Sequence, residues 1–216
     1  MIILAAALAF ASGAMDVAAF TRLGAVFCSV MTGNLVLLGL ATARESGDLA
    51  AHTAVALAGY IAGAALGSRM GGRSHREGVL WPAPVTATLL LQLLAFAGFT
   101  VGWELTSSHP TGAWQLSLLA LAALAMGLQS AAMRNIGTTL STTYLTGTLT
   151  SAVACLVNGG QPGQRNRLNV AVLVAVAAGA AAGGVLLATL PAIFPLVPIG
   201  ALTSVISLVM TVGTHQ

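Results

Sequence analysis

Charged side chains are scarce in this sequence, and lysine is absent altogether. The 216 residues carry eight Arg and five Asp or Glu. Charged residues make up 6% of the chain, against roughly 25% in soluble domains. A water-facing surface needs more charge, because contiguous apolar patches above about a few hundred Å² drive association. This shortage excludes a cytosolic enzyme, a nucleic-acid-binding protein and a secreted disulfide module.

Residues that carry catalytic chemistry are also few. The two cysteines, Cys28 and Cys155, both lie in apolar stretches, which favours packed free thiols over a disulfide or a metal site. The four histidines show no spacing typical of zinc ligands. A Ser-His-Asp set, a phosphate-binding loop and a dinucleotide fingerprint are all missing. We therefore expect no enzyme activity, no cofactor and no bound metal.

Apolar residues are what the sequence has in abundance, at 57% of the chain with a mean hydropathy of +0.92. They form long runs rich in Ala and Leu, and a spanning helix needs about 20 such residues. Trp81, Trp103 and Trp114 lie near segment ends, where interfacial aromatic residues are typical. The predicted apolar segments are 2–20, 24–43, 49–69, 79–105, 114–133, 140–157, 168–190 and a last one that follows prolines 191, 195 and 198 and ends near 212.

These segments predict an all-α, polytopic transmembrane helix bundle of six to eight membrane segments. We interpret the first segment as a membrane helix and not as a secretory signal, because it lacks a basic start and its apolar character continues. Residues 1–216 are expected to form a single membrane domain.

An internal repeat becomes visible when the chain is laid over itself at an offset of 114 residues. GAMDVAAFTRLGAVFCSVMTGNL, residues 13–35, then falls on GLQSAAMRNIGTTLSTTYLTGTL, residues 127–149. The matching pairs are Gly13 with Gly127, Ala18 with Ala132, Thr32 with Thr146, Gly33 with Gly147 and Leu35 with Leu149. We predict two homologous repeats, about 1–105 and about 112–213.

The orientation of the two repeats stays open between two alternatives. If all eight segments span, each repeat crosses the membrane an even number of times and the repeats are parallel. If the segment at each Thr-Gly pair is re-entrant or half-length, the repeats are inverted. In that case the arginine-bearing loops near 69–76 and 165–167 fall on one side, which fits the positive-inside rule better.

Three charged residues lie inside the repeated motif, flanked by apolar sequence: Asp16, Arg22 and Arg134. An ionisable group at membrane depth costs about a few kcal/mol or more, so it normally faces a bundle interior or a wet cavity and is paired. Asp16 aligns with Ser130, and Arg134 lies one helical turn beyond it. One interpretation is a structural ion pair between Asp16 and Arg134, or arginines that snorkel to the interface. The other is an ion- or proton-linked site near the midplane.

The Thr-Gly motifs supply the remaining candidates. Either they pack helices closely through small residues, or a helix breaks at Gly33 and Gly147 and offers backbone groups to a ligand. Gln129 stands beside the second motif. The candidate substrate- or ion-binding residues are Asp16, Arg22, Thr32, Gly33, Asn34, Gln129, Ser130, Arg134, Thr143, Thr146 and Gly147.

Both motifs also resemble known signatures. GAMDVAAFTRLGAVFCSVMTGNLVLLGLA and GLQSAAMRNIGTTLSTTYLTGTLTS are similar to the two signatures of the YoaK-like bacterial membrane proteins, a family of unknown function. The resemblance covers essentially the whole chain. It implies a polytopic protein of the bacterial cytoplasmic (inner) membrane, and it implies no substrate.

The function that these features favour is a small-solute or ion transporter or channel with a polar site between the two Thr-Gly motifs. The alternative is a membrane scaffold or accessory subunit in which the polar motifs only pack helices. The expected partners are the lipid bilayer and a small solute or ion, with a second copy of the chain as an open alternative and no nucleic acid.

Overall fold

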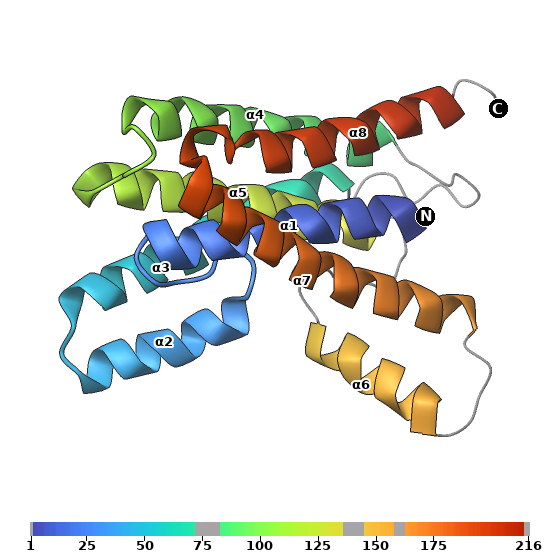
Figure 1. Ribbon diagram of the computed structural model, residues 1–216, viewed down its shortest axis with the longest axis horizontal. Helices are drawn as coiled ribbons and strands as arrows, with labels where there is room; N and C mark the ends of the chain where they lie inside the picture. Colours follow the sequence, from blue (N-terminus) through green and yellow to red (C-terminus); the bar gives the residue numbers. More distant parts are fainter. Residues whose placement is uncertain (1, 72–82, 136–144, 158–162, 214–216) are drawn as a thin grey trace.

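A computed structural model describes residues 2–71, 83–135, 145–157 and 163–213 of the chain. Helices make up nearly all of these residues (Figure 1). The elements are α1 (Ile2–Arg22), α2 (Met31–Ala43), α3 (Gly47–Gly71), α4 (Ala83–Leu105), α5 (Gly112–Asn135), α6 (Leu145–Val157), α7 (Gln164–Thr189), the short 3₁₀ helix η1 (Pro191–Ile193) and α8 (Leu196–Gly213).

One of the described helices, α2, is too short to cross a bilayer. In the part of the chain that the structure describes, six helices are long and apolar enough to span, namely α1, α3, α4, α5, α7 and α8. The helix α2 has 13 residues, whereas a span needs about 20, and α6 is described over 13 residues. The predicted all-α, polytopic helix bundle is confirmed.

The second predicted segment, 24–43, is not one continuous helix. Residues 23–30 leave the helical conformation, and α2 begins only at Met31. Gly24 and Ala25 have φ angles of +99° and +58°, a left-handed conformation that ends a helix. We call residues 23–30 the α1–α2 loop. In Figure 1 the chain turns back after α1, so that α2 begins towards the middle of the molecule and ends at its periphery.

The centre of the bundle is made by two close helix crossings, α1 against α7 and α3 against α5. Glycines permit both. A Cβ atom on Gly13 would lie 2.1 Å from the Val176 carbonyl oxygen, and one on Gly127 would lie 2.2 Å from the Tyr60 carbonyl oxygen. Backbones therefore approach without side chains between them, as small residues allow in membrane proteins.

Glycines on the partner helices, α7 and α3, approach the backbones of α1 and α5 equally closely. A Cβ atom on Gly179 would lie 2.0 Å from the Phe10 carbonyl oxygen, and one on Gly63 would lie 2.1 Å from the Leu124 carbonyl oxygen. Phe10 and Leu124 are 114 positions apart, the offset found in the sequence. Each crossing thus joins one helix from the first half of the chain to one from the second.

An aromatic cluster fixes α4 against η1. Trp103 stacks on Phe99 with ring centroids 5.5 Å apart, and its ring lies 5.6 Å from that of Phe194. The Trp103 indole N–H donates a 2.9 Å hydrogen bond to the Pro191 carbonyl oxygen. Trp103 is fully buried. Trp103 therefore lies near the end of α4, with the indole N–H bonded inside the protein.

Candidate functional site

The carboxylate of Asp16 faces the α1–α2 loop. Its Oδ1 accepts hydrogen bonds from the backbone N–H groups of Cys28 at 3.0 Å and Ser29 at 2.8 Å, and from the Cys28 thiol. Its Oδ2 accepts a hydrogen bond from the Ser29 hydroxyl. Asp16 therefore satisfies backbone donors that the break between α1 and α2 leaves without helical partners.

Asn34 binds the same loop from the other side. Its amide oxygen accepts a 2.9 Å hydrogen bond from the Phe27 N–H, and its amide nitrogen donates to the Phe27 carbonyl oxygen at 2.6 Å. The side chain is fully buried in the first turn of α2. Asp16 and Asn34, both predicted site residues, are thus brought to one loop, and both bind its backbone.

The first Thr-Gly motif lies in the first turn of α2, and the second lies at the start of the described part of α6. Thr32 and Thr146 are exposed, Gly33 and Gly147 are half-buried, and the next residues, Asn34 and Thr148, are buried. The two motifs therefore show the same order of burial at equivalent positions. In Figure 1, α2 and α6 lie along the same edge of the bundle. The candidate Thr143 lies outside the described residues.

A cavity of about 350 Å³ lies between α1, α7 and the α1–α2 loop. We call it the Asp16 cavity. Phe20 and Phe27 stack beside it with ring centroids 5.4 Å apart. Its lining is apolar apart from the Asp16 carboxylate and the Thr21 hydroxyl, and consists of Gly13, Asp16, Val17, Phe20, Thr21, Phe27, Val30, Val176 and Ala180.

Gln129 lies in a separate, buried polar network. Its amide nitrogen donates to the Ser12 hydroxyl at 2.8 Å and to the Leu8 carbonyl oxygen at 3.1 Å. Its amide oxygen accepts a 2.8 Å hydrogen bond from Gln92, whose own amide oxygen is buried without a partner. The network joins α1, α4 and α5, and it does not border the Asp16 cavity.

Ser130, Arg22 and Arg134 do not line the Asp16 cavity. The Ser130 hydroxyl accepts a 2.8 Å hydrogen bond from Tyr60. Arg22 donates to the Leu187 carbonyl oxygen at 3.1 Å, near the end of α7. Arg134 is exposed in the last turn of α5. The ion pair between Asp16 and Arg134, which the sequence left open, is not formed, because loop donors already surround the carboxylate.

Several site residues were not predicted from the sequence. Cys28 and Ser29 supply the donors to Asp16, and Phe20 and Phe27 form the aromatic wall of the cavity. The only signal available was Gly24, whose freedom at positive φ permits a break before a small polar pair. Among the described residues, no group of three or more His, Cys, Asp or Glu could hold a metal ion.

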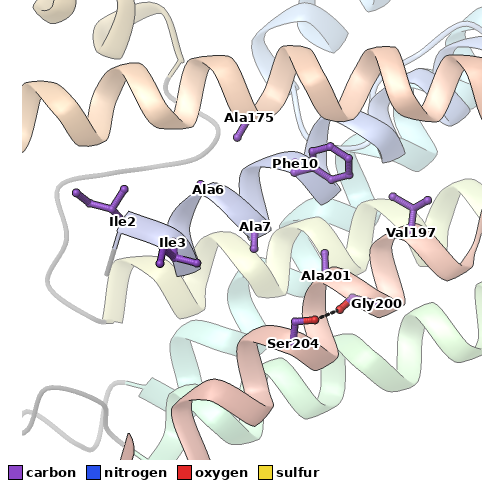
Figure 2. Close-up of a pocket in the computed structure, with 10 residues that line it drawn as sticks. All are labelled: Ile2, Ile3, Ala6, Ala7, Phe10, Ala175, Val197, Gly200, Ala201 and Ser204. Carbon is purple, nitrogen blue, oxygen red and sulfur yellow. Dashed lines mark hydrogen bonds between the residues drawn. The ribbon is translucent and has the colours of Figure 1, made fainter.

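A second hollow is larger than the Asp16 cavity and is apolar apart from one hydroxyl group. Figure 2 shows a groove of about 710 Å³ between the first turns of α1, the middle of α7 and α8. Its one hydroxyl, on Ser204, donates to the Gly200 carbonyl oxygen at 2.7 Å and is satisfied. The remaining lining is apolar, which suits lipid chains and offers no group for chemistry. The lining consists of Ile2, Ile3, Ala6, Ala7, Phe10, Ala175, Val197, Gly200, Ala201 and Ser204.

Comparison with known proteins places the chain in a family. Residues 4–209 match the family described as "Protein of unknown function (DUF1275)". The chain is 35% identical over 148 residues to the UPF0700 transmembrane protein YoaK of Bacillus subtilis (strain 168). That alignment covers 67% of this chain and 62% of the relative. No solved structure matches. With its apolar spanning helices and this match over nearly its whole length, the chain is an integral membrane protein that belongs to the YoaK-like DUF1275 family.

Proposed function

We propose that this protein is a small-solute or ion transporter or channel of the bacterial inner membrane, built from two homologous repeats. Its site includes the Asp16 carboxylate and the α1–α2 loop. The observation that carries the proposal is a half-buried carboxylate in a candidate spanning helix that borders a cavity and has no cationic partner among the described residues. Ionisable groups in such positions typically mark substrate or ion pathways.

The arrangement of the short helices supports the same function. Transporters often carry discontinuous helices near the bilayer midplane, at the interface between repeats. Here α2 is half-length and begins next to the Thr32-Gly33 pair, and the described part of α6 contains the equivalent pair Thr146-Gly147. Gly13 at the α1–α7 crossing and Gly127 at the α3–α5 crossing are separated by the same offset of 114 residues. Three long helices in each half of the described chain favour the inverted arrangement of the repeats.

The alternative function is a membrane scaffold or accessory subunit. The observation that favours it is the buried network of Gln92, Gln129 and Ser12, which packs three helices without bordering a cavity. In addition, Thr32 and Thr146 do not line the Asp16 cavity. A scaffold would use the loop bonds of Asp16 only to hold α2 in place.

Measurements of electrical current from proteoliposomes distinguish the two functions. Purified protein would be reconstituted into liposomes that are adsorbed on a supported membrane. The external solution would then be exchanged rapidly for solutions of inorganic ions, amines or carboxylates, and the resulting current recorded. Under the transport proposal at least one panel gives a current that Asp16→Asn lowers by about tenfold or more, the effect of one charge-assisted contact.

The matched control is Asp48→Asn, which removes the same charge from an exposed position in the first turn of α3. It should leave the current unchanged. If no panel gives a current and Asp16→Asn only lowers the melting temperature, the scaffold is the correct function.

A further inference from the structure

We infer that the Asp16 cavity binds a small organic cation, with its ammonium group at Asp16 and its apolar body against Phe20 and Phe27. This inference rests on the proposed function and specifies the substrate class of that site. The charge of the cavity, its volume and its aromatic wall all favour this ligand.

The charge of the cavity favours a cation. Asp16 is its one ionisable lining residue, and Arg, Lys and His are missing from the lining. A carboxylate offers about four acceptor positions over its two oxygens. Oδ1 accepts three hydrogen bonds, whereas Oδ2 accepts one, from Ser29. Oδ2 therefore keeps an acceptor position for a donor from a ligand, and an anion would be repelled.

The lining favours an organic cation over a metal ion. Hard cations take about six oxygen ligands, and the cavity offers one carboxylate. Its only other side-chain oxygen belongs to Thr21, whose hydroxyl donates to the Val17 carbonyl oxygen at 2.7 Å. The rest of the wall is aliphatic or aromatic, so it can stabilise apolar carbon and cannot replace a hydration shell.

The aromatic pair fits the same ligand. Aromatic faces attract ammonium groups within about 6 Å of the ring centroid, and Phe20 and Phe27 stack at the wall of the cavity. The volume of about 350 Å³ lies at the lower end of the range of ligand pockets, roughly 300–1,000 Å³. A single ring or short branched chain that carries one ammonium group matches this size.

Isothermal titration calorimetry on the full chain in detergent tests the inference with three probes of one shape. Benzylammonium is positive, benzyl alcohol is neutral and benzoate is negative. Wild type and Asp48→Asn should bind benzylammonium at least about tenfold more tightly than benzyl alcohol, and benzoate not at all. Asp16→Asn should lose this preference. Equal binding of all three probes, or an unchanged preference in Asp16→Asn, would overturn the inference.

A second variant keeps the test decisive if Asp16→Asn fails to fold. Val176 lines the cavity from α7, so Val176→Phe fills it while the carboxylate stays in place. Benzylammonium binding should then fall by about tenfold or more. Binding equal to that of wild type would contradict the proposed position of the ligand.

The outcomes also separate this inference from the transport proposal. Binding of benzylammonium without any current in proteoliposomes would support the cation site and reject the transport proposal. Conversely, an Asp16-dependent current carried by inorganic ions or carboxylates, with no binding of benzylammonium, would support transport and overturn the inference that the ligand is an organic cation.

Discussion

At the scale of single residues, the polar groups inside the bundle bind backbone more often than they bind each other. The sequence identified Asp16 and Asn34 as site residues from their type and their apolar surroundings. It did not reveal that both bind the α1–α2 loop, because the position of a loop in space is not encoded in residue spacing. For the same reason the sequence left the ion pair between Asp16 and Arg134 open, and Ser29 was missed as the partner of Asp16.

Removal of the Asn34 side chain should loosen the α1–α2 loop. Asn34→Ala leaves the partly buried N–H and carbonyl groups of Phe27 without their partner, at a cost of up to about 1–3 kcal/mol each. The melting temperature in detergent should fall, and the buried Cys28 thiol should react faster with a maleimide in a Cys155→Ala background. Thr32→Ala, at an exposed position of the same turn, should change neither quantity. A protected Cys28 in Asn34→Ala would show that other contacts hold the loop.

The two buried glutamines should respond unequally to replacement by leucine. Gln92→Leu removes a buried acceptor that has no partner, but it leaves the Gln129 amide oxygen unpaired instead. Because these two effects offset each other, the free energy of unfolding should change by less than about 1 kcal/mol. Gln129→Leu leaves Gln92 with neither bond, and it should cost about 1–3 kcal/mol more. Denaturation of both variants in one detergent measures the difference. A larger loss for Gln92→Leu would mean that its amide oxygen has a partner in solution.

At the scale of helices, hydropathy predicted all the membrane segments, but not where helix begins within them. The break at residues 23–30 lies in sequence as apolar as a span, so the hydropathy of segment 24–43 gave no sign of it. Positive φ angles at Gly24 and Ala25 and the bonds from Asp16 and Asn34 make the break. These contacts come from tertiary structure, which a linear pattern does not contain.

Glycine at the crossing of α1 and α7 should be intolerant of even one methyl group. In Gly13→Ala the added Cβ atom meets the Val176 carbonyl oxygen of a backbone that cannot rotate away. Overpacking of this kind costs about 1–3 kcal/mol, measured as a lower melting temperature. Gly39→Ala is the matched control, because a Cβ atom there has nothing within 4 Å. If Gly127→Ala costs as much as Gly13→Ala, the predicted repeat gains support, whereas a neutral Gly13→Ala would contradict the close crossing.

At the scale of the whole molecule, the described charges other than Asp16 lie at the two ends of the bundle. The first residues of α1 and the last of α8 lie at one end, where α3 and α5 also finish and α7 starts (Figure 1). That end bears Arg69, Arg134 and Arg167. The opposite end holds two arginines and three acids, namely Arg22, Arg44, Glu45, Asp48 and Glu104. The positive-inside rule therefore predicts that the first end faces the cytoplasm.

Cysteine labelling should reveal this orientation. In a background without the two native cysteines, Thr111→Cys lies between α4 and α5, and Gly163→Cys lies at the start of α7. A membrane-impermeant maleimide should label Thr111→Cys in intact spheroplasts, and it should label Gly163→Cys only after the membrane is permeabilised. The reverse pattern would invert the topology. Labelling of both from outside would mean that the number of crossings between them is even.

The hydrogen bonds of the α1–α2 loop carry a consequence for the order of assembly during synthesis. They join residues at most 13 positions apart, so they can form as soon as α2 has left the ribosome. The contact of Arg22 with Leu187, by contrast, closes over 165 positions. The first half of the chain can therefore form this loop while it is still in the insertion machinery. When α7 is inserted later, it closes over a cavity whose carboxylate is already in place.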